Sequence, residues 1–139
     1  LEIGFGMGIS ADKIQQLKPE KHVIVENHPH ILIKLRKWAT DKPTVEIIEG
    51  SWFDSKEQIK KYSYDGIFYD TWMDDYMYEF PKLAEEVLKP GGKFTFFNGS
   101  VKPEANEFNL PATYDVFDIS EYEQNYLAGP NYYLPTVEF

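Results

Sequence analysis

Apolar residues recur along the chain in two alternating patterns, and together they predict strands and helices in regular succession. The first pattern is a short continuous apolar run, which is typical of parallel strands that are buried on both faces. These runs predict a strand that starts at Leu1 and further strands at His22–Glu26, Val45–Glu49, Tyr64–Tyr69 and Lys93–Phe97. The second pattern places apolar residues three and four positions apart between the strands, which predicts helices.

Prolines mark where several of these helices begin or end. The first helix stops before Pro19, the second starts near Pro29, and a weak lysine-rich helix reaches Lys61. Pro81 kinks or delimits the start of a helix at Tyr76–Leu88. The expected inner faces of the first, second and fourth helices are Ile9, Ile14 and Leu17; Ile31, Leu32, Leu35 and Trp38; and Phe80, Leu83, Ala84, Val87 and Leu88.

The pattern changes in the last third of the chain. A turn at Lys89–Gly92 leads into the fifth strand, and the polar segment Val101–Ala112 is expected to be mostly loop. Two further strands are predicted at Tyr114–Ile119 and Tyr132–Phe139. Pro135 lies within the second of them, where it should mark a bulge or an edge strand, since proline cannot donate to a sheet.

Five β/α units followed by a strand pair predict an α/β fold with a doubly wound, mainly parallel sheet. At 139 residues we expect a single domain over residues 1–139, with the core units in 1–100 and a loop and terminal strand pair in 101–139. The chain starts without Met inside its first strand, so we expect it to be truncated at the N-terminus. The short segment between the fifth and sixth strands leaves little room for a helix, so we also expect a shortened C-terminal part.

Composition removes several classes of function. The formal net charge of −9 argues against sequence-independent nucleic-acid binding and against binding to anionic membranes. The chain has no cysteine and no apolar run near 18 residues, so we predict no thiolate metal site and a soluble, cytoplasmic protein. No third ligand accompanies His28 and His30, and no Gly-x-Ser-x-Gly motif is present, so neither a metal site nor a serine hydrolase is predicted.

The most informative motif is the glycine-rich turn Gly4–Gly8, which follows the first strand and opens the first helix. Alternating glycines allow a ligand to approach the backbone, and a helix start offers unpaired N–H groups. Glu26 ends the second strand, where a carboxylate would accept hydrogen bonds from a ribose diol. The pair predicts an adenosine-containing cofactor; the alternatives are plain packing of the turn and an exposed strand-end glutamate.

Other candidate residues follow the third, fourth and fifth strands, at the edge where a doubly wound sheet binds ligands. Ser51 and Trp52 could contact an adenine ring, although Trp52 could equally be a core aromatic. Asp70 ends an apolar strand, so its carboxylate needs a cationic or hydrogen-bonding partner unless it caps a helix. Trp72 could lie over a cation or pack in the core. Asp74, Asp75 and Glu79 could add to the negative field around Asp70, but we interpret them as a solvated acidic helix start.

These segments resemble class I S-adenosylmethionine-dependent methyltransferases, and within them guanidinoacetate N-methyltransferase and the fungal arginine δ-N-methyltransferases. The segments that carry the resemblance are Leu1–Ile9, Val25–Pro29, Glu49–Trp52, Tyr64–Thr71, Leu88–Gly92 and Phe96–Gly99. The Gly-Phe-Gly-Met turn and the Tyr-Asp-Thr strand end are the most specific to this group. The likeness covers the chain well to about residue 100 and the remainder only loosely.

The resemblance implies a role for each matching residue. The cofactor S-adenosylmethionine would be held by Gly4, Phe5, Gly6, Met7, Gly8, Glu26, Asn27, Gly50, Ser51, Trp52 and Tyr69. The substrate would be held by Asp70, Thr71, Trp72, Asn98 and Gly99, with Asp70 as the catalytic residue that binds the guanidinium. The implied reaction is N-methylation of a small guanidino compound, such as guanidinoacetate or arginine, in preference to a protein.

Three alternatives remain open at this point. The acceptor could be another small molecule, such as an amine or a carboxylate, or the chain could be a non-catalytic binding module. Family members also use an upstream segment that closes the pocket, which these 139 residues do not include. The chain could therefore be inactive alone, take this lid from a second copy or a partner protein, or accept a different substrate.

Overall fold

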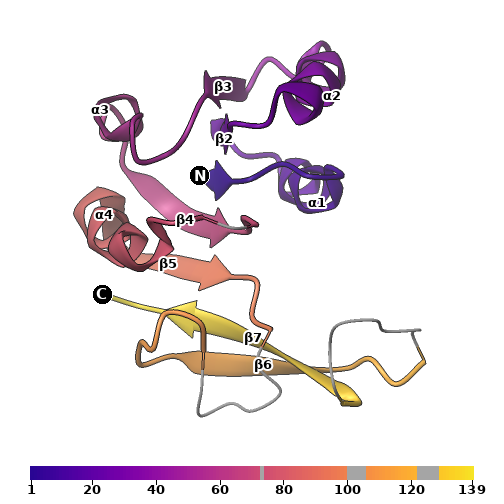
Figure 1. The fold of residues 1–139 in the computed structure, drawn as a ribbon, viewed down its shortest axis with the longest axis vertical. Helices are drawn as coiled ribbons and strands as arrows, with labels where there is room; N and C mark the ends of the chain where they lie inside the picture. The colour runs from indigo at the N-terminus through magenta and orange to yellow at the C-terminus, as the bar shows by residue number, and fades with distance from the viewer. Residues whose placement is uncertain (73, 100–105, 122–128) are drawn as a thin grey trace.

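The computed structural model describes residues 1–72, 74–99, 106–121 and 129–139, and its centre is a seven-stranded sheet (Figure 1). The strands follow the order β3-β2-β1-β4-β5-β7-β6. Strands β1 to β5 run parallel, and β7 is antiparallel to both of its neighbours. The strands are β1 (Glu2–Ile3), β2 (His22–Glu26), β3 (Val45–Glu49), β4 (Tyr64–Tyr69), β5 (Leu88–Phe96), β6 (Thr113–Asp118) and β7 (Asn131–Val137).

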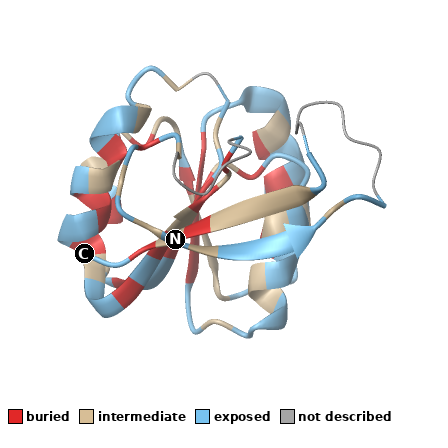
Figure 2. Cartoon of the chain, turned by 90° about the horizontal axis from the view of Figure 1, so that it is seen from below, coloured by how far each residue is buried: buried red, intermediate tan, exposed pale blue. Residues whose placement is uncertain are grey.

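Helices cover both faces of the parallel part of the sheet, which confirms the predicted doubly wound α/β fold. The helices are α1 (Ile9–Gln16), α2 (Pro29–Ala39), α3 (Lys56–Ile59), the 3₁₀ turn η1 (Met77–Glu79) and α4 (Phe80–Val87). One layer holds α1 and α2 and the opposite layer holds α3 and α4 (Figures 1 and 2). The order of the strands reverses at β1 and β4, so the edge where these two strands end is the expected ligand site.

Each face of the sheet has its own apolar core. Under α1 and α2, Leu32 and Leu35 pack on Phe5 and Ile24. Under α3 and α4, a larger cluster includes the inward face of α4, formed by Phe80, Leu83, Ala84 and Val87. Strand β2 is buried along its whole length, as predicted for a central parallel strand. The predicted inner faces of the second and fourth helices are therefore confirmed in their main positions.

The predicted inner face of the first helix is wrong. Ile9 and Leu17 are 72% and 82% exposed, and Ala11 is the residue of α1 that is buried. Helix α1 is only eight residues long, and the small side chain of Ala11 faces the core. Apolar spacing alone misled the prediction because the helix has too few turns to fix its phase.

The predicted turn at Lys89–Gly92 lies within β5. The strand begins directly at the end of α4, and its pairing with β4 shifts between Tyr64 and Gly66. Gly91 has φ +77 inside this stretch, so glycine allows the chain to change direction without leaving the strand. Pro81 lies in the first turn of α4, so it marks the helix start as expected.

The hairpin β6–β7 extends the sheet beyond the helices. Strand β6 is almost entirely exposed and forms one edge, whereas β7 lies between β5 and β6. Of the two predictions for Pro135, the edge is confirmed and the bulge is not: its pairing with β6 is regular, and β5 pairs with β7 only at Thr136 and Val137, so β7 is paired on one side only at Pro135. The predicted loop residues 101–105 and residues 122–128 between the strands lie outside the described residues.

Candidate functional site

The glycine turn is shaped by positive φ angles that only glycine adopts readily. Gly4, Gly6 and Gly8 have φ of +89, +53 and +79. A Cβ on Gly4 would lie 2.0 Å from the backbone oxygen of Asp70, so the turn passes directly against the end of β4. A Cβ on Gly6 would meet nothing within 4 Å, which leaves open space over the middle of the turn. The turn thus offers accessible backbone next to Asp70, as a ligand cradle requires.

Glu26 is held at the end of β2 by backbone donors. Its Oε2 accepts a hydrogen bond from the N–H of Phe5 at 2.9 Å. Its Oε1 accepts hydrogen bonds from the N–H groups of Asn27 and His28, at 2.9 and 2.8 Å. A carboxylate has about four lone-pair positions, so three N–H donors leave room for a further donor on Oε2. The carboxylate is oriented before any ligand arrives, and Asn27 beside it is exposed.

The loop after β3 meets Glu26 through the backbone. The N–H of Gly50 donates to the carbonyl oxygen of Glu26 at 2.8 Å, and the Ser51 hydroxyl accepts from the N–H of Phe53 at 3.1 Å. Trp52 is only 2% exposed and packs edge-on against Phe80, with ring centroids 5.0 Å apart. Its indole face is not open to an adenine ring, so the structure places Trp52 in the core, as the alternative interpretation had it.

Asp74 joins three parts of the site, which the sequence did not reveal. Its Oδ2 accepts a hydrogen bond from the indole N–H of Trp52 at 2.5 Å and another from the Tyr69 hydroxyl. Its Oδ1 accepts from the N–H of Tyr76 at 2.9 Å. Burial of the Tyr69 ring, together with this bond, raises the pKa of the Tyr69 hydroxyl. The interpretation of Asp74 as part of a solvated helix start is therefore wrong.

Asp70 differs from these groups because its carboxylate is exposed and has no hydrogen bond or ion pair among the described residues. Desolvation by the surrounding chain raises the pKa of Asp70, and the negative charges of Glu2 and Glu107 raise it further. A carboxylate in this setting is more basic than usual and lacks a compensating charge. It is thus ready to bind a cation.

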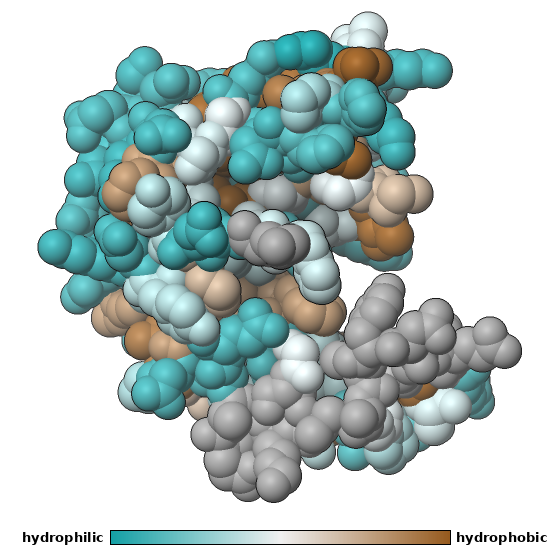
Figure 3. Space-filling view, viewed as in Figure 1, coloured by the Kyte–Doolittle hydropathy of each residue, from teal (hydrophilic) through white to brown (hydrophobic). Residues whose placement is uncertain are grey.

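A pocket of about 320 Å³ opens beside Asp70. The described residues that line it are Thr71, Trp72, Asp74, Asp75, Met77, Phe97 and Glu107. Three of these carry carboxylates and, within the described part of the chain, none carries a positive charge. Trp72 is 89% exposed at its rim, so of its two predicted roles the structure removes packing in the core. On the side where the strands end, the surface is visibly hollowed (Figure 3).

The exit of β5 forms the opposite wall of the site. Asn98 is fully buried; its N–H donates to the Tyr132 hydroxyl at 3.1 Å, and its side-chain amide donates to the Tyr133 carbonyl at 3.2 Å. Gly99 is exposed, and its N–H donates to Oε1 of Glu107 at 3.2 Å. Asn98 thus anchors this wall to β7, and Phe97 is the residue of the β5 exit that lines the pocket. Glu107, in the predicted loop, was missed by the sequence analysis.

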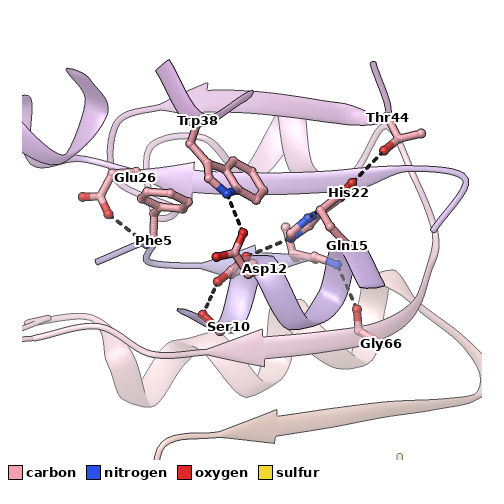
Figure 4. A network of polar contacts seen from close by, with 11 residues as sticks. Phe5, Ser10, Asp12, Gln15, His22, Glu26, Trp38, Thr44 and Gly66 are labelled. Atoms are coloured by element: carbon pink, nitrogen blue, oxygen red, sulfur yellow. Dashed lines mark hydrogen bonds and ion pairs between the residues drawn. The ribbon is translucent and has the colours of Figure 1, made fainter. Parts of the chain in front are cut away.

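A buried polar network lies near the glycine turn, and Figure 4 shows Ser10, Gln15 and His22 as parts of it. Glu2 and His22 are 0% and 1% exposed, and Nε2 of His22 lies 2.8 Å from Oε2 of Glu2. The Ser10 hydroxyl donates to Oε1 of Glu2 at 2.5 Å, and the Gln15 amide nitrogen lies 3.1 Å from Nδ1 of His22. The network fixes the start of α1 to strands β1 and β2. A glutamate and a histidine within apolar strands were the available signal for it.

Other parts of the described chain do not form a comparable site. A larger, shallow hollow of about 710 Å³ lies at the end of α2, lined by Lys34, Lys37, Trp38, Thr40, Asp41 and Lys42, away from the strand ends. Within the described residues, no three His, Cys, Asp or Glu side chains are grouped so that they could hold a metal ion. No helix in the described part is long and apolar enough to span a membrane.

Comparison with known sequences gives consistent matches. Proteins named protein arginine N-methyltransferase 2 are similar over most of the chain. The one from Candida glabrata is 37% identical over 138 residues, which cover 90% of this chain and 32% of that protein. The one from Yarrowia lipolytica is 30% identical over 171 residues, which cover 100% of this chain and 36% of that protein. The chain thus spans about a third of the length of these relatives.

Solved structures share the fold at low sequence identity. A precorrin-6y C5,15-methyltransferase from Geobacter metallireducens has a TM-score of 0.67 at 16% identity, covering 97% of this chain and 76% of its own. The glycopeptide N-methyltransferase MtfA in complex with S-adenosylmethionine has a TM-score of 0.54 at 16% identity, covering 99% of this chain and 57% of its own. These matches show the Rossmann-like fold of class I methyltransferases.

A family model described as guanidinoacetate N-methyltransferase matches residues 1–122. The match includes the glycine turn, Glu26, Asp70 and the β5 exit, which the structure gathers at one edge of the sheet. Because it extends over well more than half of the chain, the protein belongs to the guanidinoacetate N-methyltransferase family.

Proposed function

We propose that this chain is the catalytic domain of an S-adenosylmethionine-dependent N-methyltransferase that acts on a guanidino group. The observation that carries the proposal is Asp70: an unpaired carboxylate at the end of β4, against the glycine turn and beside an acidic pocket. Membership in the family supports the reaction class. The relatives' names refer to arginine in proteins, and the family's name refers to guanidinoacetate, so both kinds of acceptor enter the test.

The cofactor fits the residues on the other side of the turn. The open space over Gly6 allows a ligand to approach the backbone, and Glu26 keeps capacity for one further hydroxyl donor. Ser51, Asn27 and the backbone at Gly50 surround the same strand ends, and we assign them to the nucleoside end of the ligand. Trp52 and Tyr69 support this wall from within the core. When bound, S-adenosylmethionine supplies an electrophilic methyl group on a sulfonium.

Asp70 then performs two tasks for the acceptor. A guanidinium carries its charge at all ordinary pH values and matches a carboxylate through two parallel hydrogen bonds, so Asp70 can hold and orient it. As the nitrogen forms its bond to the methyl carbon, it must lose a proton, and Asp70 is the adjacent base. Its raised pKa makes it a better proton acceptor than an ordinary aspartate. Thr71 and Trp72 at the pocket wall would confine the acceptor.

The test uses methyl-labelled S-adenosylmethionine with guanidinoacetate, free arginine, an arginine peptide and simple amines. We expect label on a guanidino compound. In D70N, transfer should fall by roughly 100- to 10,000-fold, the usual value of general-base catalysis. Cofactor affinity, measured by calorimetry, should stay within about twofold, because Asp70 has no role in the proposed cofactor contacts. The matched control is D115N, which removes the same charge from exposed β6 and should retain full activity.

Different outcomes would support the alternatives. Label on an amine but on no guanidine would favour a different acceptor class. Folded protein that binds no cofactor would favour a non-catalytic binding module. Retained transfer in D70N would remove Asp70 from the mechanism, even if the reaction class holds.

A further inference from the structure

We propose that Glu107 is a specificity-determining residue that excludes acceptors carrying a free carboxylate on the same molecule as the guanidino group. The chemical class selected would be an arginine whose carboxyl group is blocked, as within a peptide chain. This inference rests on the proposed function, because it concerns the pocket that is assigned to the acceptor.

Glu107 is firmly placed although it lies between secondary-structure elements. On one side, the Asn106 side chain accepts hydrogen bonds from the N–H groups of Phe108 and Leu110, each at 3.2 Å. The Asn106 amide also donates to the Leu110 carbonyl at 2.8 Å and to the Tyr114 hydroxyl at 2.9 Å. On the other side, Phe108 is 7% exposed. The turn that carries Glu107 is thus fixed by a buried ring and by a side chain with four hydrogen bonds.

Phe108 reaches the centre of the larger core. Its ring lies against Tyr69, Phe94 and Phe96, with centroids 5.3, 5.4 and 4.6 Å away. Tyr69 directly precedes Asp70, so the turn of Glu107 is packed against the strand that carries the proposed base. The relative positions of the two carboxylates are therefore set by the core.

The Glu107 carboxylate faces the pocket from the side opposite β4. It lines the pocket together with Thr71 and Trp72, and its charge acts on Asp70. Its Oε1 also accepts a hydrogen bond from the N–H of Gly99 at 3.2 Å, which holds the Glu107 carboxylate next to the exit of β5.

The negative charges around the pocket favour the guanidinium of an arginine and disfavour its carboxylate. A guanidinium is attracted by Asp70, Asp74, Asp75 and Glu107 together, whereas a carboxylate on the same molecule is repelled by them. The described lining includes no lysine, arginine or histidine that could compensate. Like charges brought together at a binding site are a strong means of rejecting a wrong partner. An amide or peptide carbonyl at that position avoids the repulsion.

The experiment compares two ligands that differ only in this charge: Nα-acetyl-arginine and Nα-acetyl-arginine amide. Equilibrium affinities are measured by calorimetry without methyl transfer, so the result does not depend on the proposed reaction. For the unmodified chain we expect the amide to bind at least about tenfold more tightly. In E107Q, whose amide oxygen can still accept from Gly99, the preference should fall to about threefold or less. In E107K it should reverse.

The matched control is E85Q, which removes one carboxylate from the exposed face of α4, outside the pocket lining, and should leave the preference unchanged. Thermal unfolding of each variant checks that the fold is intact. The inference is overturned if the unmodified chain binds both ligands equally, if neither ligand binds, or if E107Q keeps the full preference. The labelled-methyl assay with the arginine peptide separately decides the proposed function.

Discussion

Two carboxylates at the same edge of the sheet differ in their exposure, in their hydrogen bonds and in the charges around them. Glu26 ends β2 and Asp70 ends β4, on either side of β1. Glu26 is 7% exposed and accepts three backbone N–H groups. Asp70 is exposed, accepts no hydrogen bond from the described residues, and is repelled by Glu2 and Glu107.

The difference indicates which ligand each group can serve. Backbone N–H groups spread the charge of Glu26 and fix its orientation, which suits neutral hydroxyl donors such as a ribose. Asp70 keeps its full charge in an acidic setting, which suits a cation that must be bound and then deprotonated. The edge is thus divided into a rigid half, which we propose for the cofactor, and an electrostatically unbalanced half, which we propose for the acceptor.

The largest effect should come from G4A, since Gly4 joins the two halves. A Cβ there would lie 2.0 Å from the Asp70 carbonyl oxygen, and φ is +89, so the backbone must move. We expect a loss of more than about 3 kcal/mol in the free energy of unfolding, measured with urea. In G6A the Cβ has open space at φ +53, so only about 1–2 kcal/mol should be lost. Equal losses in the two variants would show that the contact with Asp70 does not matter.

A smaller effect is expected from E26A. The variant leaves the N–H groups of Phe5, Asn27 and His28 without their acceptor. This should lower the free energy of unfolding, measured with urea, by about 2–3 kcal/mol. Cofactor affinity should fall as well. The control is E49A, which removes an exposed carboxylate from the end of β3 together with its ion pair to Arg36, and should cost less than about 1 kcal/mol. A similar cost for both would mean that Glu26 is no more preorganised than a surface glutamate.

The third test measures how the affinity for the acceptor changes gradually with pH. A guanidinium stays charged across the accessible range, so the pH dependence reports the carboxylates around it, which are Asp70 and the pocket residues Asp74, Asp75 and Glu107. Because the pKa of Asp70 is raised, affinity should be full at neutral pH and fall as the pH drops through a value above that of an ordinary aspartate. Below that value the loss should approach tenfold per pH unit. Affinities from calorimetry between pH 4 and 7 measure it, with D70N as the control that should show a smaller fall, due only to the remaining pocket carboxylates. A midpoint at or below the ordinary aspartate value would contradict the raised pKa.

Much of the fold was predictable because its signals are local. The continuous apolar run at His22–Glu26 could only be a strand buried on both faces, and the spacing of Leu32 and Leu35 fixed the inner face of α2. The first helix was less predictable, because eight residues give too few turns for the apolar period to fix the inward side, and Ala11 is the buried residue. Which of the two predictions holds for Pro135 could not be decided either, since this depends on where the neighbouring strand stops pairing.

The candidate site divides in the same way. The turn Gly4–Gly8 follows β1, Glu26 ends β2 and Asp70 follows β4. The topology of a parallel sheet therefore predicts that they meet at one edge. Asp74 and Glu107 carried no such signal. Asp74 connects separate parts of the site because the indole N–H of Trp52, 22 positions away, and the Tyr69 hydroxyl both donate hydrogen bonds to its carboxylate. Glu107 reached the pocket because Phe108 beside it is drawn into the core.

The sequence by itself determined the order of strands and helices, the glycine turn, the strand-end carboxylates and the resemblance to a methyltransferase family. Each of these depends on neighbouring residues and on the periods of strands and helices. Only the tertiary structure decided that the Glu26 carboxylate accepts three hydrogen bonds, whereas the Asp70 carboxylate has no partner among the described residues. Hydrogen bonding and repulsion depend on distances between segments far apart in the chain, and those distances are set when the two cores pack.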